Sequence, residues 1–483
     1  MPTLTAAELV FAITLVATYG AAMLARWHSR EDRHSGLAAM KLNRWMVGLS
    51  AGTTANSGFI VTGAVGLGYA YGLHWVLLPL SWLLGDIVFW YLFPSRINQQ
   101  GRVSRATTLS EFLSFNLSGW AASAIAMLCA LLVLTCLTGY TAAQWLAGQK
   151  FLGGAFAMSE WTALALFALL IVAYSAIGGF RGSVYTDTLQ AIIRILGTVI
   201  ALAAVVWFAI AAPAAFYRNL GSAGASFLEV LPGGLAITVG FVLGFAAAAV
   251  GFGLGQPQIV SRYLAGSSPE ETRAAWWIYI SFVQFTWIAM TIFGVLLRGV
   301  MPGIADPETG LSLFFQHNIG TVLTGVIVAD IFATIASTTN GLLIAMAQAV
   351  QHDLLPRMFR NKQLRVPIPV LTLLIGVVTM LVSVTVHGTV FTLAIASVSM
   401  MGAGLAAAVM IKVLGWKHSG MSMLASISVG ILAAILWKHF GLGSTFNESG
   451  VGMAAGLIAN WAILKVTRNE QSSTASAPSD VVN

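Results

Sequence analysis

Stretches of about 20 apolar residues, each long enough to cross the roughly 30 Å hydrocarbon core of a bilayer, recur along almost the whole chain. Charged residues make up only 8% of the sequence and hydrophobic residues 58%, whereas soluble domains carry roughly 25% charged residues. Backbone polar groups inside a bilayer must be satisfied within the protein, and helices do this locally. The sequence therefore predicts an all-α integral membrane protein.

We expect about thirteen transmembrane spans. They are placed at residues 6–26, 42–68, 72–94, 120–148, 159–178, 187–212, 233–262, 273–298, 320–349, 367–387, 390–411, 421–437 and 450–467. The connecting segments are short and contain neither a phosphate-binding loop nor a Cys-rich cluster, which excludes an ATP-driven pump. We expect a single transmembrane domain over 1–468 that is not an enzyme. The polar segment 469–483 is expected to be a disordered cytoplasmic tail.

The basic residues indicate the orientation. Of the 24 Lys and Arg residues, 19 fall in segments on one side of the predicted spans, four on the other, and Arg194 lies within a span. The positive-inside rule then places the N-terminus outside and the C-terminus in the cytoplasm, as a multi-pass protein of a cell inner membrane. The net charge of +7 follows from these cytoplasmic loops near anionic lipid. Membrane lipid is thus an expected partner and nucleic acid is not.

Two of the apolar stretches are interrupted at corresponding positions in the two halves of the chain. The first interruption is Leu49-Ser50-Ala51-Gly52-Thr53-Thr54-Ala55-Asn56-Ser57-Gly58, and the second is Gly251-Phe252-Gly253-Leu254-Gly255-Gln256-Pro257. Polar, Gly- or Pro-rich segments at membrane depth are tolerated where they line a cavity. A matched pair of them is typical of the substrate and ion site of a secondary transporter.

The first interruption and the ninth span have the chemistry of a cation site. A weakened helix frees backbone carbonyls, and hard cations such as Na⁺ take oxygen ligands. In the ninth span Thr334, Ser337 and Thr338 share one helix face, with Asp330 one turn before them. The alternatives are a small-residue packing face at the interruption and hydroxyls that bond only to their own helix.

Three further ionisable residues lie at membrane depth. Asp187 begins the sixth span, where a carboxylate can cap the helix, relay an ion, or do both. Arg194 and Asp86 are costly inside a bilayer and require partners. One interpretation is a buried ion pair among Arg194, Asp86 and Asp330. The other is that Arg194 meets a substrate carboxylate through its planar fork.

The ordered set of motifs resembles the sodium/solute symporter family, and within it the sodium/proline symporter branch. The matching pieces are Ser50-Ala51-Gly52, Thr54, Ser57-Gly58, Gly178-Gly179-Phe180, Thr186-Asp187-Thr188-Leu189-Gln190, Gly255-Gln256-Pro257-Gln258-Ile259 with Arg262, and Ser337-Thr338. The resemblance implies a leucine-transporter-type fold with discontinuous helices and two inverted repeats, at about 42–212 and 233–411.

The resemblance also implies site residues. The Na⁺ site maps to the backbone carbonyls of Thr53, Asn56 and Thr334 and to the hydroxyls of Ser337 and Thr338. A second ion or proton maps to Asp187, with Asn340 where the family has a hydroxyl. The expected substrate-binding residues are Thr54, Ser57, Gly58, Gly253, Gln256, Pro257 and Arg194.

The chain departs from the proline symporters around the expected substrate. It has Ala55 where they carry an Asp, and Ala249 and Gly253 where they carry a Trp and a Tyr. Losing both aromatic side chains is expected to enlarge the pocket and remove a stacking surface.

The function expected from these residues is Na⁺-coupled symport of a small polar organic solute, an amino acid or an organic acid, by alternating access. The partners are then the solute, Na⁺ and lipid, for a monomer or weak oligomer. Two alternatives remain open. One is an H⁺-coupled symporter with Asp86, Asp187 or Asp330 as proton carrier, and the other is a membrane solute sensor with a transporter-like fold.

Overall fold

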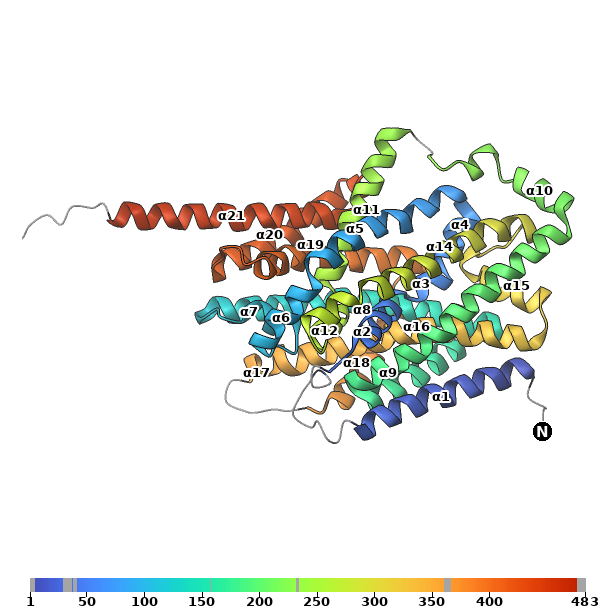
Figure 1. The fold of residues 1–483 in the computed structure, drawn as a ribbon, viewed down its shortest axis with the longest axis horizontal. Coiled ribbons are helices and arrows are strands. Elements are labelled where there is room, and N and C mark those ends of the chain that lie inside the picture. Colours follow the sequence, from blue (N-terminus) through green and yellow to red (C-terminus); the bar gives the residue numbers. More distant parts are fainter. Residues whose placement is uncertain are drawn as a thin grey trace, which may run out of the picture.

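Eleven helices are long and apolar enough to cross a membrane in the computed structural model, which describes residues 5–28, 37, 41–156, 158–231, 234–359 and 366–475. These long helices are α1 (Ala6–His28), α5 (Leu77–Leu92), α8 (Gly119–Phe156), α9 (Glu160–Ala211), α11 (Leu235–Gly255), α14 (Trp276–Val300), α16 (Thr321–Gln348), α18 (Ile368–Thr385), α19 (Val390–Val413), α20 (Gly420–His439) and α21 (Glu448–Ala475). They lie roughly along one direction in a single bundle (Figure 1). The prediction of an all-α membrane protein is confirmed.

Shorter helices connect or interrupt the long ones. They are α2 (Arg44–Ala55), α3 (Gly58–Val61), α4 (Gly63–Tyr71), α6 (Pro94–Ser104), α7 (Leu109–Ser114), α10 (Pro213–Gly221), α12 (Pro257–Leu264), α13 (Pro269–Ala274), α15 (Gly310–Asn318) and α17 (Leu355–Met358). The expected span 42–68 thus consists of three pieces, α2, α3 and α4. Helix α9 covers two expected spans, 159–178 and 187–212, which join at a kink. At this kink the backbone of Gly179 leaves the helical region (φ 58°, ψ −157°), a conformation that favours glycine. The number thirteen therefore stays a prediction.

Both predicted interruptions break a helix. Helix α2 ends at Ala55, and Ser57 caps α3 by accepting a hydrogen bond from the Phe59 amide at 3.3 Å. Helix α11 ends at Gly255, and α12 begins at Pro257, whose missing N–H is tolerated at a first helical position. The two breaks create free backbone groups where the chain is buried.

The C-terminal helix is longer than the sequence indicates. Helix α21 continues to Ala475, seven residues into the segment 469–483 that we expected to be a disordered tail, and it projects beyond the bundle (Figure 1). Glu470 and Gln471 are good helix formers, which favours this extension. Residues 476–483 lie outside the described part of the chain.

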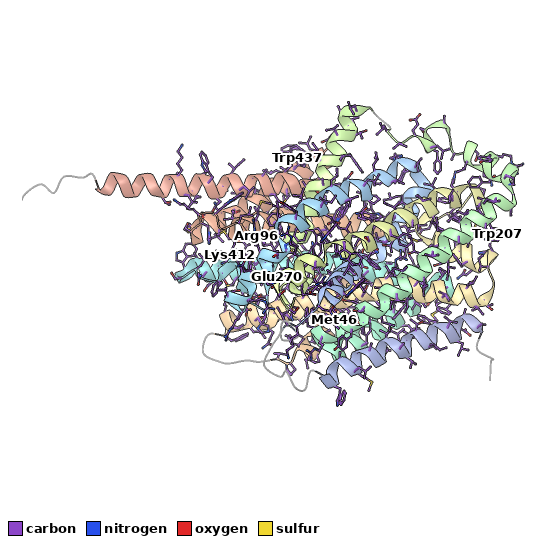
Figure 2. The ribbon with its side chains drawn as sticks, in the orientation of Figure 1. Met46, Arg96, Trp207, Glu270, Lys412 and Trp437 are labelled. Carbon is purple, nitrogen blue, oxygen red and sulfur yellow. The ribbon has the colours of Figure 1, made fainter. Side chains whose placement is uncertain are left out.

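Two basic residues lie at the opposite end of the bundle from Trp207. Arg96 and Lys412 lie toward one end, and Trp207 lies at the other (Figure 2). Arg96 and Lys412 belong to the segments predicted on the cytoplasmic side, so their shared end agrees with the alternation of spans. The orientation of that end relative to a membrane stays a prediction.

Helices α4 and α14 pack with their backbones in close approach. A Cβ atom on Gly294 would lie 2.1 Å from the Val65 carbonyl oxygen, and one on Gly68 would lie 2.2 Å from the Thr291 carbonyl oxygen. Small residues permit such contacts between membrane helices. This packing fixes the C-terminal half of the broken span, α4, against α14.

We expect Gly294→Ala to destabilise the protein by about 1–3 kcal/mol, because the added methyl group meets backbone that cannot rotate away. Gly20→Ala is the matched control, since nothing lies within 4 Å of a Cβ atom there. Thermal unfolding in detergent measures both variants. Equal unfolding temperatures would contradict the close packing.

Candidate functional site

The end of α2 carries two backbone carbonyls that have lost their helical partners. In a continuous helix the Thr53 and Thr54 carbonyls would accept from the amides of Ser57 and Gly58. The Ser57 amide instead donates to the Ala55 carbonyl at 3.0 Å, and the Gly58 amide donates to Gln144 Oε1 at 2.9 Å. Both carbonyls are therefore free to bind a group outside their own helix.

Hydroxyl groups of α16 bind these two carbonyls. Ser337 Oγ donates to the Thr53 carbonyl at 3.1 Å, and Thr338 Oγ1 donates to the Thr54 carbonyl at 3.0 Å. Thr338 Oγ1 also lies 3.5 Å from the Thr53 carbonyl, and Ser337 Oγ lies 3.1 Å from the Thr334 carbonyl. All five residues are buried. The contacts gather carbonyl and hydroxyl oxygens with no solvent around them, which suits a hard cation.

Asn56 lies at the same break, but its side chain points elsewhere. The Asn56 amide nitrogen donates to Thr286 Oγ1 on α14. Its backbone carbonyl is also released from the helical pattern, since the Ile60 amide donates to the Ser57 carbonyl at 2.9 Å. Asn56 therefore connects the carbonyl cluster to a neighbouring cavity.

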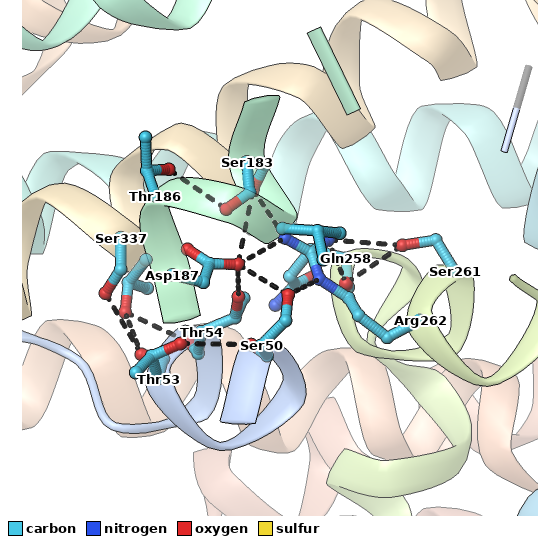
Figure 3. Close-up of polar contacts among 12 residues, drawn as sticks. Ser50, Thr53, Thr54, Ser183, Thr186, Asp187, Gln258, Ser261, Arg262 and Ser337 are labelled. Atoms are coloured by element: carbon cyan, nitrogen blue, oxygen red, sulfur yellow. Dashed lines mark hydrogen bonds and ion pairs between the residues drawn. The ribbon is translucent and has the colours of Figure 1, made fainter. Parts of the chain in front are cut away.

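A second buried network centres on Asp187 (Figure 3). Its Oδ2 atom accepts from Ser50 Oγ at 2.6 Å and from Thr54 Oγ1 at 3.3 Å, both on α2. Arg262 of α12 forms a buried salt bridge to the same oxygen at 3.2 Å. Arg262 Nε also donates to Ser50 Oγ at 3.1 Å, and Nη2 donates to Ser183 Oγ at 2.7 Å.

The structure corrects one interpretation of Asp187, that it caps a helix. Asp187 does not cap a helix, because it lies within the second arm of α9, eight residues after the break at Gly179. Asn340 is not among the residues that bond to Asp187 in the described part of the chain, and the Oδ1 atom of Asn340 has no hydrogen-bond partner there. We did not predict Arg262 as the partner of Asp187, since its position after the Gly-Gln-Pro motif made it one of the cytoplasmic basic residues.

Arg194 forms a buried ion pair with Asp330. Its Nη1 atom lies 3.0 and 2.8 Å from the two carboxylate oxygens, and both side chains are almost fully buried. Asp86 does not take part, which corrects the expected three-residue cluster. The reason is packing: Arg194 and Asp330 lie on α9 and α16, which pack together, whereas Asp86 lies on α5, which packs on α11 and α14.

A central cavity of about 50 Å³ lies beside the break between α2 and α3. Most of its wall is aromatic or aliphatic. The lining residues are Ala55, Asn56, Ser57, Phe59, Ile60, Leu78, Trp82, Tyr140, Phe252, Tyr279, Val283, Trp287, Phe391, Ala394, Ile395 and Val398. This composition agrees with solute sites, which are mostly apolar with a few placed polar groups.

Of the residues expected to bind substrate, only Ser57 lines the central cavity. Thr54 bonds to Asp187 and Arg194 bonds to Asp330. The other expected residues, Gly58, Gly253, Gln256 and Pro257, do not belong to its wall. Gly58 packs against Ala147 and Gly253 packs against Phe89. Gln256 Oε1 accepts a hydrogen bond from the Gln258 side-chain nitrogen Nε2 at 2.8 Å.

The cavity is also more aromatic than we expected. Helix α11 turns Phe252 toward it rather than Gly253, and Trp82, Tyr279 and Trp287 complete the aromatic wall. Aromatic side chains from other helices thus stand in for those that the sequence lacks at positions 249 and 253. Hydropathy gave no signal for this, because it does not say which residues of distant helices face each other.

A larger cavity of about 590 Å³ adjoins the central one and shares Phe391 and Ile395 with it. It lies at the end of the bundle where α5, α11 and α19 begin. The Phe391 ring lies 5.3 Å from the Phe59 ring and 5.7 Å from the Trp75 ring. Phe391 therefore separates the central cavity from a wide vestibule.

Comparison with known proteins agrees with this architecture. The model of the sodium:solute symporter family matches residues 37–430. The chain is 23% identical over 448 residues to the osmoregulated proline transporter of Bacillus subtilis (strain 168), which covers 89% of each chain. It is 25% identical over 433 residues to the sodium/proline symporter of Escherichia coli (strain K12), which covers 84% of this chain and 82% of that one. The chain belongs to the sodium:solute symporter family.

A solved structure has the same fold as this symporter. A substrate-bound, outward-open Na⁺-coupled sialic acid symporter matches it with a TM-score of 0.79 at 16% identity, covering 95% of this chain and 98% of that one. The fold is of the leucine-transporter type, as predicted. Members of this family couple solute movement to sodium, so the chain is a multi-pass membrane transporter and not an enzyme.

We expect Arg194→Met to destabilise the symporter by about 3–5 kcal/mol, because it leaves the Asp330 carboxylate buried without its partner. Replacing both residues, as Arg194→Met with Asp330→Asn, removes the charge and is expected to restore most of that stability. Thermal unfolding of the two variants at neutral pH measures the difference. A double variant no more stable than Arg194→Met would contradict the pairing.

Proposed function

We propose that this chain is a Na⁺-coupled secondary active symporter that imports a small organic solute across a bacterial inner membrane by alternating access. The observation that carries the proposal is the pair of carbonyls at the end of α2, Thr53 and Thr54, which bind the Ser337 and Thr338 hydroxyls of α16. These oxygens belong to two helices that a bound cation would hold together.

In this proposal Na⁺ binds the carbonyls of Thr53, Asn56 and Thr334 and the hydroxyls of Ser337 and Thr338. Two observations support this set of ligands. The carbonyls of Thr53 and Asn56 are released from the helical pattern. The Ser337 hydroxyl lies 3.1 Å from the Thr53 carbonyl and 3.1 Å from the Thr334 carbonyl. Without Na⁺ the hydroxyl protons satisfy the carbonyls. With Na⁺ the hydroxyls turn and offer lone pairs instead.

The ion drives transport through differential affinity. A bound Na⁺ must stabilise the solute-binding arrangement of α2 against α16 more than the other conformation. The membrane potential adds about 2.3 kcal/mol per charge at 100 mV, which corresponds to roughly a fifty-fold concentration bias. The inverted repeats at about 42–212 and 233–411 would supply the rocking motion.

The solute would occupy the central cavity and enter through the vestibule. The vestibule lies at the end of the bundle that we propose to face outward, with the N-terminus outside and the C-terminus in the cytoplasm. The Asp187–Arg262 pair ties α9 to α12 away from the vestibule, which supports an inner side that is closed in this conformation.

We propose a single Na⁺ for each transport cycle. Arg262 supplies a positive charge to Asp187 at 3.2 Å, and the chain has Asn340 and Gly341 where a second ion site would need hydroxyls. A second cation would compete with the guanidinium for the same carboxylate.

The rival mechanism is proton coupling, and one observation favours it at one residue. Asp187 and Asp330 are both paired with arginines, but Asp86 Oδ2 is buried without a hydrogen-bond partner in the described part of the chain. Asp86 is therefore the carboxyl group that a proton-coupled mechanism would use.

Proteoliposome uptake separates Na⁺ coupling, proton coupling and sensing. The probes are radiolabelled L-proline and the solutes selected by a Na⁺-dependent thermal-shift screen of amino acids, monocarboxylates, sugars and sialic acid. We expect uptake to follow an inward Na⁺ gradient and to ignore a pH gradient. Uptake that follows only the pH gradient would overturn Na⁺ coupling, and Na⁺-dependent binding without uptake would favour a sensor.

A matched pair of variants tests the site in the same assay. Thr338→Val removes a hydroxyl that contacts the α2 break, whereas Thr339→Val removes one that bonds to the Ile335 carbonyl of its own helix. We expect Thr338→Val to raise the Na⁺ concentration for half-maximal uptake at least tenfold, and Thr339→Val to leave it within about twofold. Equal behaviour of the two variants would contradict the proposed site.

A further inference from the structure

The Asn56 side chain is held in one orientation by Thr286. Thr286 Oγ1 lies 2.8 Å from the Phe282 carbonyl and 3.1 Å from the Val283 carbonyl of its own helix, so its single proton is donated within α14. Towards Asn56 the hydroxyl can then only accept. The Asn56 amide nitrogen, which is the donor, therefore faces Thr286.

This orientation leaves the side-chain oxygen of Asn56, Oδ1, as a free acceptor. Asn56 is only 2% exposed and lines the central cavity. Its Oδ1 atom has no hydrogen-bond partner among the described residues. A buried acceptor without a partner is costly, and this one belongs to one of the few polar residues that line the cavity.

The rest of the cavity wall offers no counter-charge. No Lys, Arg, His, Asp or Glu belongs to the lining residues of the described chain. The two arginines buried most deeply near the broken helices are both paired elsewhere, Arg194 with Asp330 and Arg262 with Asp187. An anion in this cavity would lose its hydration and find no basic side chain in return.

We propose that the transported solute presents an N–H or O–H donor to Asn56 Oδ1, carries no net negative charge, and places an apolar or aromatic body against the rings of Trp82, Phe252 and Trp287. Asn56 is thereby a specificity-determining residue, and Thr286 is a positioning residue that fixes the orientation of the Asn56 side-chain amide. The assignment rests on the proposed function, because it takes the central cavity as the solute site. It separates this symporter from transporters of acidic sugars.

Probe pairs that differ in the donor test the assignment. Purified protein in NaCl is screened by thermal shift and calorimetry with L-proline against N,N-dimethylproline, indole against N-methylindole, and benzamide against N,N-dimethylbenzamide, with sialic acid as the anionic probe. We expect each methylated probe to bind at least tenfold more weakly than its donor-bearing partner, and we expect no binding of sialic acid. Methylated probes that bind equally well, or a sialic acid hit, would overturn the assignment.

Variants of α14 show whether Thr286 sets the preference. Thr286→Val removes the acceptor that holds the Asn56 side-chain amide. The preference for donor-bearing probes over their methylated partners is therefore expected to fall from at least tenfold to within about threefold. Thr286→Ser keeps the hydroxyl and is expected to retain the preference. Thr291→Val is the matched control, because that hydroxyl bonds to Trp287 of its own helix at 3.0 Å and does not line the cavity. A Thr286→Val protein with an unchanged preference would contradict the role of Thr286.

The outcomes distinguish this inference from the proposed function. Na⁺-dependent binding that ignores the donor contradicts the inference and leaves symport standing. A panel without any Na⁺-dependent ligand counts against both. Binding that prefers the donor but does not depend on Na⁺ supports the inference and contradicts Na⁺ coupling.

Discussion

The centre of this molecule depends on two backbone carbonyls at the end of α2 that only another helix can satisfy. The Thr53 and Thr54 carbonyls have lost their amide partners and bind the hydroxyls of Ser337 and Thr338. Inside a bilayer, where water does not compete, an unpaired carbonyl costs several kcal/mol. The break in α2 is therefore stable while α16 is docked against it, and in the proposed mechanism a bound Na⁺ would take over the Thr53 carbonyl. In the proposed mechanism this requirement would link the binding of Na⁺ to the position of α16.

The surrounding ion pairs join the two broken helices into one assembly. Asp187 accepts hydrogen bonds from Ser50 and Thr54 at the first break and forms a salt bridge with Arg262 of α12, the helix that follows the second break. Arg194 and Asp330 then tie α9 to α16 one turn before the hydroxyl cluster. Both pairs lie away from the central cavity, which leaves that cavity to aromatic side chains and to Asn56. In the proposed mechanism, ion coupling and solute recognition would share the segment from Thr53 to Ser57 but use different atoms of it.

Much of the fold follows from the sequence, because span length and hydropathy are local properties. The interruptions at Thr53–Gly58 and Gly251–Pro257 and the hydroxyl stripe of Thr334, Ser337 and Thr338 also follow from residue type and helical spacing. What could not be predicted is which helices face each other. Arg262 reaches Asp187 across 75 positions, Asp86 lies on a helix remote from Arg194, and Phe252 rather than Gly253 faces the cavity. Periodicity identifies the buried face of one helix but does not show which neighbouring helix that face contacts. For the same reason Thr286 carried no signal, since its role depends on meeting Asn56.

The most direct test of the account is equilibrium binding of ²²Na⁺ to purified, solute-free protein, with N-methyl-D-glucamine replacing Na⁺ to hold ionic strength. The account predicts saturable binding of one ion per chain. It also predicts that Ser337→Ala combined with Thr338→Val weakens binding at least tenfold while thermal unfolding shows the variant still folded. An unchanged ²²Na⁺ affinity in that folded variant would contradict the claim that Na⁺ binds between α2 and α16.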